Sequence, residues 1–434
     1  MPHVPDPDEL RAQGVRGVIL SYVDTAGITR IKTVPVSRLA HAARWGVGMS
    51  PVFDVFLSDD SITSTAELGS PDGDLRLVPD LDRLVVLTAQ PGWAWAPVDR
   101  FTQAGEPWAA DQRGFTRRMV QRARAAGLEF RMAIEVEWAV GRDVEGFEPA
   151  CTGPAYGMTR LIELSDYARD VLAALADQDV QVEQLHPEYS DGQFEVSVAA
   201  ADPLQAADDS MLVRHTVRAV AQRHGLKVSF APSVIAGHVG NGGHVHLSAW
   251  RDGENLFTGF PAGPGGPAAA GILSHLPALL ALGAPTPASY LRLVPSHWAG
   301  AFACWGVETR ETALRYIPGN TGLAGAANLE VKCVDLAANP YLLLGGLIAA
   351  ALDGIEAQRP LPPPVAGDPA HLPDAPRLPT TLDAAVDAFA AAPVLREALG
   401  DTLADAVIAV RRAEAARFRD AAPDAVVAAL RWVF

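Results

Sequence analysis

The feature of this sequence that most constrains its fold is a pair of glutamates, Glu135 and Glu137, within the stretch Leu128–Trp138. Apolar and charged residues alternate there, which predicts a β-strand with every second side chain on the same face. The two carboxylates would then lie about 7 Å apart along one face. Taken alone, the pair fits a solvated strand face. Like charges this close also repel, so a fold would separate them or place a cation between them.

The composition limits the class of protein. The chain has 434 residues, of which 49% are apolar and 20% charged, and this predicts a globular protein of two or three domains. Its longest apolar run, Pro340–Leu352, is too short for a membrane span and predicts a buried helix. A formal charge of −16 disfavours nucleic acids and anionic membranes as partners. Anionic small substrates would therefore need a local basic cluster.

Two features predict a cytoplasmic location. The three cysteines, Cys151, Cys304 and Cys333, are scattered and odd in number, as expected in a reducing compartment. The segment Met1–Asp6 lacks the basic and apolar regions of a signal peptide.

The first hundred residues predict a small domain of short strands. Gly17–Asp24 and Thr29–Pro35 flank an Asp-x-x-Gly turn and predict a β-hairpin. Further short strands, ending with Leu84–Thr88, suggest an antiparallel domain that ends near Pro97, so we place its boundary at residue 100.

Residues 101–434 predict a catalytic domain in which strands and helices are interspersed. Helices are expected over Gln112–Ala126 and over residues 165–178, where Ser165 is a candidate N-cap. Residues 359–379 contain eight prolines and therefore predict a loop, which a helical C-terminal tail follows.

Three further stretches contain acidic, histidine or lysine side chains that could act with this pair. Glu188 and Glu195 flank a glycine-containing turn. A glycine-rich approach, Gly240–Gly243, precedes His244 and His246, which share a predicted strand face. Glu330 and Lys332 share another face. Each stretch alone also fits a solvated turn, a hydrogen-bonded core histidine or a surface ion pair.

Together, these stretches resemble the motifs of the glutamine synthetase family, in the same order and over nearly the whole chain. The motifs are Ile134–Glu137; Glu188, Gln193 and Glu195; Gly240–Ser248; Ser289–Pro295; Thr309–Glu311 with Arg315; and Glu330 with Ala338–Leu342. The resemblance implies an α+β fold, with a small N-terminal β-grasp-like domain and a large catalytic domain of the glutamine synthetase/guanido kinase-like type.

The resemblance also implies a cage for two divalent cations. Glu137, Glu188 and Glu195 match the ligands of the first cation. Glu135, His244 and Glu330 match those of the second. Five carboxylates and one imidazole suit Mg²⁺ or Mn²⁺ better than zinc or copper. Two such cations would also relieve the repulsion between Glu135 and Glu137.

Other positions match residues that bind the substrates, ATP and glutamate. His246 and Ser248 match positions near the ATP phosphates, and Glu183 matches one near the ribose. Arg292 matches the residue that binds the α-carboxylate of glutamate, and Gly240 lies beside it. Glu188 and Lys332 also match substrate-binding positions, although an arginine is usual at the position of Lys332. Arg310 and Arg315 match the pair that neutralises the transferred phosphoryl group. The implied reaction phosphorylates the γ-carboxylate of glutamate, and an amine then displaces phosphate.

One departure bears on which amine is used. Glutamine-forming members carry a glutamate on the flap after Arg-Leu-Val-Pro, where this chain has Trp298. An indole cannot accept a proton, but its ring can contact an organic ammonium. The aspartate that completes the ammonium site is not identified by the sequence, and both Asp54 and Asp60 are candidates.

We therefore expect a γ-glutamylamine ligase that uses an alkylamine, ethanolamine, a polyamine or an arylamine. Trp298 favours a smaller or flatter amine, whereas the charge of −16 favours a cationic polyamine. A glutamine synthetase that uses ammonium and a catalytically silent regulatory or assembly relative are the alternatives. The resemblance further implies a homo-oligomer, a dodecamer of two hexameric rings whose active sites lie between subunits.

Overall fold

The computed structural model describes residues 5–144 and 146–434. The first four residues of the segment examined for a signal peptide, and Glu145, lie outside this range. The strands are β1 (Gly17–Val23), β2 (Thr29–Pro35), β3 (Val47–Met49), β4 (Leu75–Pro79), β5 (Val85–Val86), β6 (Trp93–Phe101), β7 (Glu129–Ile134), β8 (Val136–Arg142), β9 (Val182–Pro187), β10 (Gln193–Val198), β11 (Leu226–Ser229), β12 (Val245–Arg251), β13 (Glu254–Asn255), β14 (Phe302–Val307), β15 (Thr312–Ile317) and β16 (Asn328–Val331).

The helices alternate with these strands and dominate the C-terminal part. The α-helices are α1 (Pro7–Ala12), α2 (Leu39–Trp45), α3 (Gln112–Ala125), α4 (Met158–Glu163), α5 (Ser165–Asp177), α6 (Pro203–Arg223), α7 (Gly265–Gly283), α8 (Pro287–Arg292), α9 (Pro340–Glu356), α10 (Leu382–Ala390), α11 (Pro393–Leu399), α12 (Asp401–Arg417) and α13 (Pro423–Leu430). The short 3₁₀ helices are η1 (Val36–Arg38), η2 (Pro51–Val55), η3 (Leu81–Arg83), η4 (Ala324–Ala326) and η5 (Pro369–His371).

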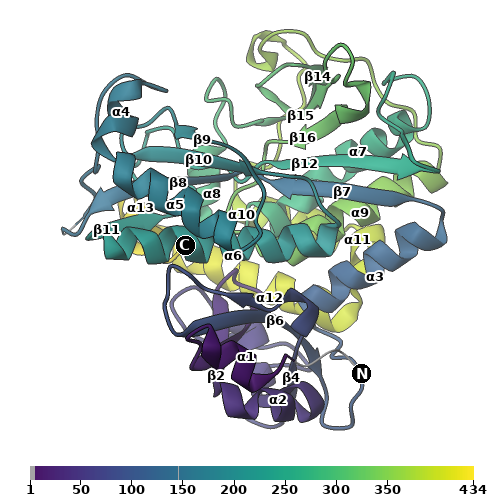
Figure 1. Ribbon diagram of the computed structural model, residues 1–434. Coiled ribbons are helices and arrows are strands. Elements are labelled where there is room, and N and C mark those ends of the chain that lie inside the picture. Colours follow the sequence, from purple (N-terminus) through teal and green to yellow (C-terminus); the bar gives the residue numbers. More distant parts are fainter. Residues whose placement is uncertain (1–4, 145) are drawn as a thin grey trace.

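The N-terminal domain is a sheet that lies below the catalytic domain in Figure 1. Strands β1 and β2 form the predicted antiparallel hairpin. The prediction of a purely antiparallel domain was wrong, because β1 pairs with β6 in the parallel direction. Dozens of residues separate these two strands, and a connection of that length can return the chain to the same end of the sheet.

The catalytic domain contains two sheets that meet at Glu135. One has the order β11-β8-β10-β9, and the other the order β13-β12-β16-β15-β14 with β7 paired to β12. The prediction of one continuous strand through residue 138 was therefore wrong. Strand β7 ends at Ile134 in one sheet, and β8 begins at Val136 in the other. The Glu135 backbone N–H donates a hydrogen bond to the His244 carbonyl oxygen, 2.9 Å away.

Helices pack beneath the two sheets and bury the largest core (Figure 1). The apolar run from Pro340 forms α9, which is buried over most of its length, as predicted. Helix α7 is long and apolar enough to cross a membrane, but 78% of its apolar window is buried inside the fold. It packs closely against α9, so it is a core helix.

Other local predictions had mixed outcomes. The predicted helices at Gln112 and at residue 165 are α3 and α5. Ser165 is not a cap, because α4 leads directly into α5 and Leu164 occupies the N-cap position without a side-chain hydrogen bond. The proline-rich segment 359–379 is a loop interrupted by η5, and helices follow it.

Candidate active site

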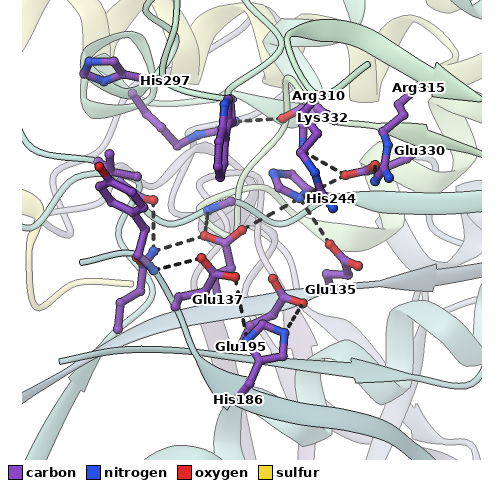
Figure 2. Close-up of a pocket in the computed structure, with 18 of the residues that line it drawn as sticks. Glu135, Glu137, His186, Glu195, His244, His297, Arg310, Arg315, Glu330 and Lys332 are labelled. Atoms are coloured by element: carbon purple, nitrogen blue, oxygen red, sulfur yellow. Dashed lines mark hydrogen bonds and ion pairs between the residues drawn. The ribbon is translucent and has the colours of Figure 1, made fainter. Parts of the chain in front are cut away.

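A cavity of about 870 Å³ opens between the two sheets of the catalytic domain. Figure 2 shows acidic side chains converging on it from both sheets, with basic side chains on one side. Its ionisable lining residues are Glu135, Glu137, His186, Glu188, Glu195, His244, His246, Arg292, His297, Arg310, Arg315, Glu330 and Lys332. The cavity therefore contains most of the site residues predicted from the sequence.

Glu137, Glu188 and Glu195 form one acidic group at the four-stranded sheet. Glu137 on β8 lies directly opposite Glu195 on the antiparallel neighbour β10. Glu188 follows β9, the strand on the other side of β10. Burial, together with the charges of Glu137 and Glu195, raises the pKa of Glu188 to about 7. Three carboxylates this close are stable at neutral pH only with a proton or a cation among them.

Glu135, His244 and Glu330 form a second group at the other sheet. The His244 Nδ1 atom lies 3.2 Å from a Glu135 carboxylate oxygen and 3.3 Å from one of Glu330. His246 also reaches this group, because its Nε2 atom lies 3.0 Å from Glu135 Oε1. The predicted ligands of each cation are thus close together.

The donor atoms of these groups fit a hard divalent cation. Donors from Glu135, His246 and Glu330 lie within 4.8 Å of one another, as do donors from His186, Glu188 and Glu195. Carboxylate oxygens supplemented by imidazole suit Mg²⁺ or Mn²⁺. His186 was missed from the sequence, although its position two residues before Glu188 was a signal.

The glycine-rich approach to β12 brings backbone close to these acids. The Gly242 N–H donates a 2.7 Å hydrogen bond to Glu137 Oε2. A Cβ atom at Gly242 would lie 2.4 Å from the His244 ring, so the position requires glycine. Gly240 lies beside Arg292, whose Cγ atom would be 3.1 Å from an added Cβ.

Basic side chains line the part of the cavity next to Glu330. The Lys332 Nζ atom lies 2.9 Å from Glu330 Oε1, and Arg315 Nη1 lies 3.0 Å from Glu330 Oε2. Burial would raise the pKa of Glu330, but the charges of Lys332, His246 and His244 together outweigh burial and lower that pKa to about 2. Arg310 extends into the cavity from the loop before β15.

Arg292 is the last residue of α8, a short helix whose N-terminus is capped by side chains. Thr286 caps its N-terminus in a capping box with Ser289. The Arg292 guanidinium donates to the backbone oxygens of Lys332 and Val334, at 3.2 and 2.8 Å. These contacts hold the positively charged Arg292 guanidinium in the cavity wall, where a carboxylate of a substrate could reach it.

A second groove, of about 410 Å³, shares Glu135 and His246 with the cavity. It also contains Glu183 and Ser248, the two other residues predicted to contact the nucleotide. The Trp250 indole N–H donates to the Ser248 hydroxyl at 2.8 Å, and the Arg131 guanidinium lies over the Trp250 ring. The structure therefore places all the predicted nucleotide residues along one groove that adjoins the acidic groups.

Trp298 lies at the cavity on the loop between α8 and β14. Its side chain is 49% exposed, and it has the left-handed backbone conformation, with φ +54°. Two tyrosines that the sequence analysis did not identify also line the cavity. Tyr156 donates a 2.8 Å hydrogen bond to Glu188 Oε2, and the Tyr189 ring faces the Trp298 ring. No motif pointed to Tyr156, whereas the position of Tyr189 directly after Glu188 was a signal.

The two candidate aspartates of the N-terminal domain are absent from the cavity lining of this chain. Asp54 is fully buried, 2.7 Å from Arg100 and 2.8 Å from the Trp108 indole nitrogen. Asp60 is exposed and lies 2.6 Å from Arg30. Of the two, only Asp60 could reach another molecule without disruption of a buried ion pair.

An acidic cage between two sheets, a basic cluster beside it and an adjoining groove together suit an enzyme that binds divalent cations and anionic substrates. The comparisons with known proteins identify the family. The family description "Glutamine synthetase, catalytic domain" matches residues 109–428, and "Glutamine synthetase N-terminal domain" matches residues 6–108. The chain belongs to the glutamine synthetase family, and it is an acid–amine ligase.

Similar proteins cover nearly the whole chain. A gamma-glutamylpolyamine synthetase, GlnA3, from Streptomyces coelicolor is 61% identical over 98% of this chain and 95% of its own length. A glutamine synthetase from Methanocaldococcus jannaschii is 30% identical over 96% of this chain and 95% of its own length. A solved structure of a novel glutamine synthase homolog superposes with a TM-score of 0.88, at 33% identity, over 97% of this chain and 99% of the other. A GmaS/ADP complex superposes with a TM-score of 0.86, at 29% identity, over 97% of both chains. These comparisons confirm the predicted fold class.

Proposed function

We propose that this chain joins the γ-carboxylate of glutamate to a polyamine, at the expense of ATP and through a γ-glutamyl phosphate. The observation that carries the choice of an organic amine over ammonium is Trp298, which lines the cavity where ammonium-using relatives are expected to have a glutamate. The 61% identity to a gamma-glutamylpolyamine synthetase also supports an organic amine. Among the amines left open by the sequence, this identity favours the polyamine over the smaller or flatter amine that Trp298 suggested.

The basic residues have distinct roles in this proposal. Arg292 binds the α-carboxylate of glutamate, with the Gly240 backbone beside it. Arg310, Arg315 and Lys332 stabilise the negative charge that develops on the transferred phosphoryl group and on the acyl phosphate. A carboxylate is a poor acceptor for an amine, and phosphorylation makes it reactive.

The acidic residues would hold two divalent cations, Mg²⁺ or Mn²⁺. Glu137, Glu188 and Glu195 would hold one, and Glu135, His244 and Glu330 the other. When bound, such cations neutralise phosphate charge and orient the phosphoryl group. Glu183, His246 and Ser248 would contact ATP in the adjoining groove.

An amine that is protonated in solution must lose one proton before it can attack the γ-glutamyl phosphate. Glu188, besides serving as a cation ligand, lines the cavity directly beside Tyr189 and is placed to bind the ammonium of the amine. The Tyr156 hydroxyl, which donates to Glu188 Oε2, keeps one oxygen of that carboxyl in place.

A phosphate-release assay tests the proposal. Purified protein is supplied with glutamate, ATP, Mg²⁺ and one amine at a time: ammonium, ethanolamine, butylamine, 1,4-diaminobutane, spermidine or aniline. We expect the polyamines to give the highest kcat/KM. Higher activity with ammonium than with every organic amine would contradict the proposal and indicate a glutamine synthetase.

The remaining elements of the proposal concern assembly and location. We propose a cytoplasmic dodecamer of two hexameric rings, in which the N-terminal domain of one subunit completes the active site of the next. The exposed position of Asp60 supports a role for this residue at the amine site of a neighbouring subunit.

A further inference from the structure

Two half-exposed aromatic rings, Tyr189 and Trp298, lie in edge-to-face contact with each other at the catalytic cavity. Their ring centroids are 6.3 Å apart, at an interplanar angle of 67°. Both residues line the cavity, and they are 52% and 49% exposed. Large rings gain free energy when they are covered, so a pair left open in an active site is available to a ligand.

The two rings come from separate parts of the chain. Tyr189 directly follows Glu188, and its backbone N–H donates a 2.9 Å hydrogen bond to Glu188 Oε2. Trp298 lies on the loop between α8 and β14. The pair therefore connects that loop to the carboxylate that we assign to the attacking ammonium.

Glu311 fixes the backbone at Trp298. The Trp298 N–H donates a 2.7 Å hydrogen bond to Glu311 Oε1, and the Glu311 side chain is buried. Ser296 and Trp298 both have positive φ values, +59° and +54°, which L-residues rarely adopt without support from their surroundings. The Ser296 hydroxyl adds a 2.7 Å hydrogen bond to Asp368.

We propose that Tyr189 and Trp298 form an amine-selecting wall, which contacts the methylene chain of the amine and binds its second ammonium over a ring face. Glu311 is a positioning residue that keeps Trp298 in this wall. The inference rests on the proposed function and adds residues that determine the amine. An ammonium ion has no chain to contact the wall, whereas the chain and second charge of a diamine can use both rings.

Three amines that differ in one property at a time test the wall. Ammonium has no carbon chain, butylamine has a four-carbon chain, and 1,4-diaminobutane adds a second charge to the same chain. The kcat/KM of each amine is measured for the native protein and for Tyr189→Leu, Tyr189→Phe, Glu311→Ala and Glu311→Gln.

We expect Tyr189→Leu to lower kcat/KM for 1,4-diaminobutane relative to ammonium by about tenfold, mainly through the KM of the diamine. Tyr189→Phe retains the ring and should retain the preference. Glu311→Ala should reproduce the effect of Tyr189→Leu, whereas Glu311→Gln keeps an acceptor oxygen and should restore most of the preference. The KM of glutamate should change little, which a general structural defect would not produce.

The outcomes separate the two proposals. A native protein that uses organic amines, combined with a Tyr189→Leu variant whose amine preference is unchanged, would overturn the wall and leave the proposed function in place. A native protein that uses ammonium alone would overturn both. If Tyr189→Leu does not fold, Trp298→Leu tests the same wall from the other side, and an unchanged amine preference would again overturn it.

Discussion

Glu135 has the most constrained position among the acids of the cavity, because it lies where the chain passes from one sheet to the other. Burial would raise the pKa of its carboxyl group, but the positive charge of His246 and hydrogen bonds from His244 and His246 outweigh burial and lower it. Glu135 is therefore ionised at neutral pH, as a cation ligand must be.

Replacement of Glu135 tests the two-cation proposal. We expect Glu135→Ala to reduce ATP-dependent phosphate release by about 100-fold or more, because a cation ligand is lost while the surrounding packing remains. Glu129→Ala is the matched control, since Glu129 is exposed on the adjacent strand β7. Circular dichroism should show the same fold for both variants. Turnover close to that of the native protein in Mg²⁺ would contradict the two-cation assignment.

Replacement of Trp298 tests which residue selects the amine. Trp298→Glu places a carboxylate where ammonium-using relatives are expected to have one, so the kcat/KM for ammonium should rise relative to that for 1,4-diaminobutane, by about tenfold or more. Steady-state kinetics with both amines measure the change. An unchanged ratio would mean that the residue at this position does not select the amine.

The residues that the sequence revealed are those carried by short motifs. Glu135, Glu137 and Glu188 each lie in a motif of a few residues, so their proximity could be inferred from resemblance. Tyr156 enters the cavity through tertiary contacts that no local pattern encodes, whereas Tyr189 directly follows the predicted ligand Glu188. Asp54 is a candidate that the sequence suggested and the structure makes unsuitable. Its carboxylate forms a buried ion pair with Arg100, which the sequence does not reveal.

Among the elements, strand directions and strand partners were the least predictable. Alternation of apolar and polar residues predicts a strand but contains no information about the strand that pairs with it. For this reason the chain between Leu128 and Trp138 was predicted as one strand, although β7 and β8 belong to different sheets. Helix α9 was predicted well, because a long apolar run marks it as a buried helix.

The backbones of helices α7 and α9 approach each other closely at Gly271 and Gly354. A Cβ atom at Gly354 would lie 2.1 Å from the Pro267 carbonyl oxygen and 2.7 Å from the Gly271 Cα atom. Neither contact can be relieved by a side-chain rotation, since both involve backbone atoms. Glycine at this position thus allows two apolar helices to pack against each other.

Gly354→Ala should therefore destabilise the protein, although alanine favours a helix more than glycine does. We expect a loss of about 1–3 kcal/mol, typical of overpacking, which thermal unfolding would show as a lower Tm. Gly325→Ala is the control, because an added Cβ there has no neighbour within 4 Å. Equal Tm values for Gly354→Ala and the native protein would show that the two helices can separate at little cost.

At the scale of the whole molecule, the clustering of acids makes stability depend on cations and on pH. In the cation-free protein, burial and the charges of Glu137 and Glu195 raise the pKa of Glu188 to about 7. Glu188 is mostly protonated at pH 6 and ionised at pH 8. The folded state then loses stability as the pH rises through 7, because ionised Glu188 repels its neighbours.

Addition of Mg²⁺ should therefore raise the Tm more at pH 8 than at pH 6. Thermal unfolding with Mg²⁺ or with a chelator at both pH values measures the difference. Glu188→Gln provides the control, since it cannot ionise and should reduce the pH dependence of the Mg²⁺ effect. A larger effect of Mg²⁺ at pH 6 would contradict the assignment of this carboxyl group to a cation site.

The proposed sharing of active sites between subunits can be tested by mixing two inactive variants. Glu135→Ala removes a residue of the catalytic domain, and Asp60→Asn removes a carboxylate that would act in the site of a neighbouring subunit. In a closed ring whose sites each combine two subunits, random mixing of equal amounts leaves about a quarter of the sites with both native residues. Dissociation and reassembly of the mixture should thus restore activity that neither variant has alone.

A mixture no more active than its components would show that each chain builds its site by itself, or that Asp60 is not the residue supplied. Asp60→Asn separates these cases, because full activity of this variant alone would exclude Asp60 and leave the shared site to be tested with another residue of the N-terminal domain.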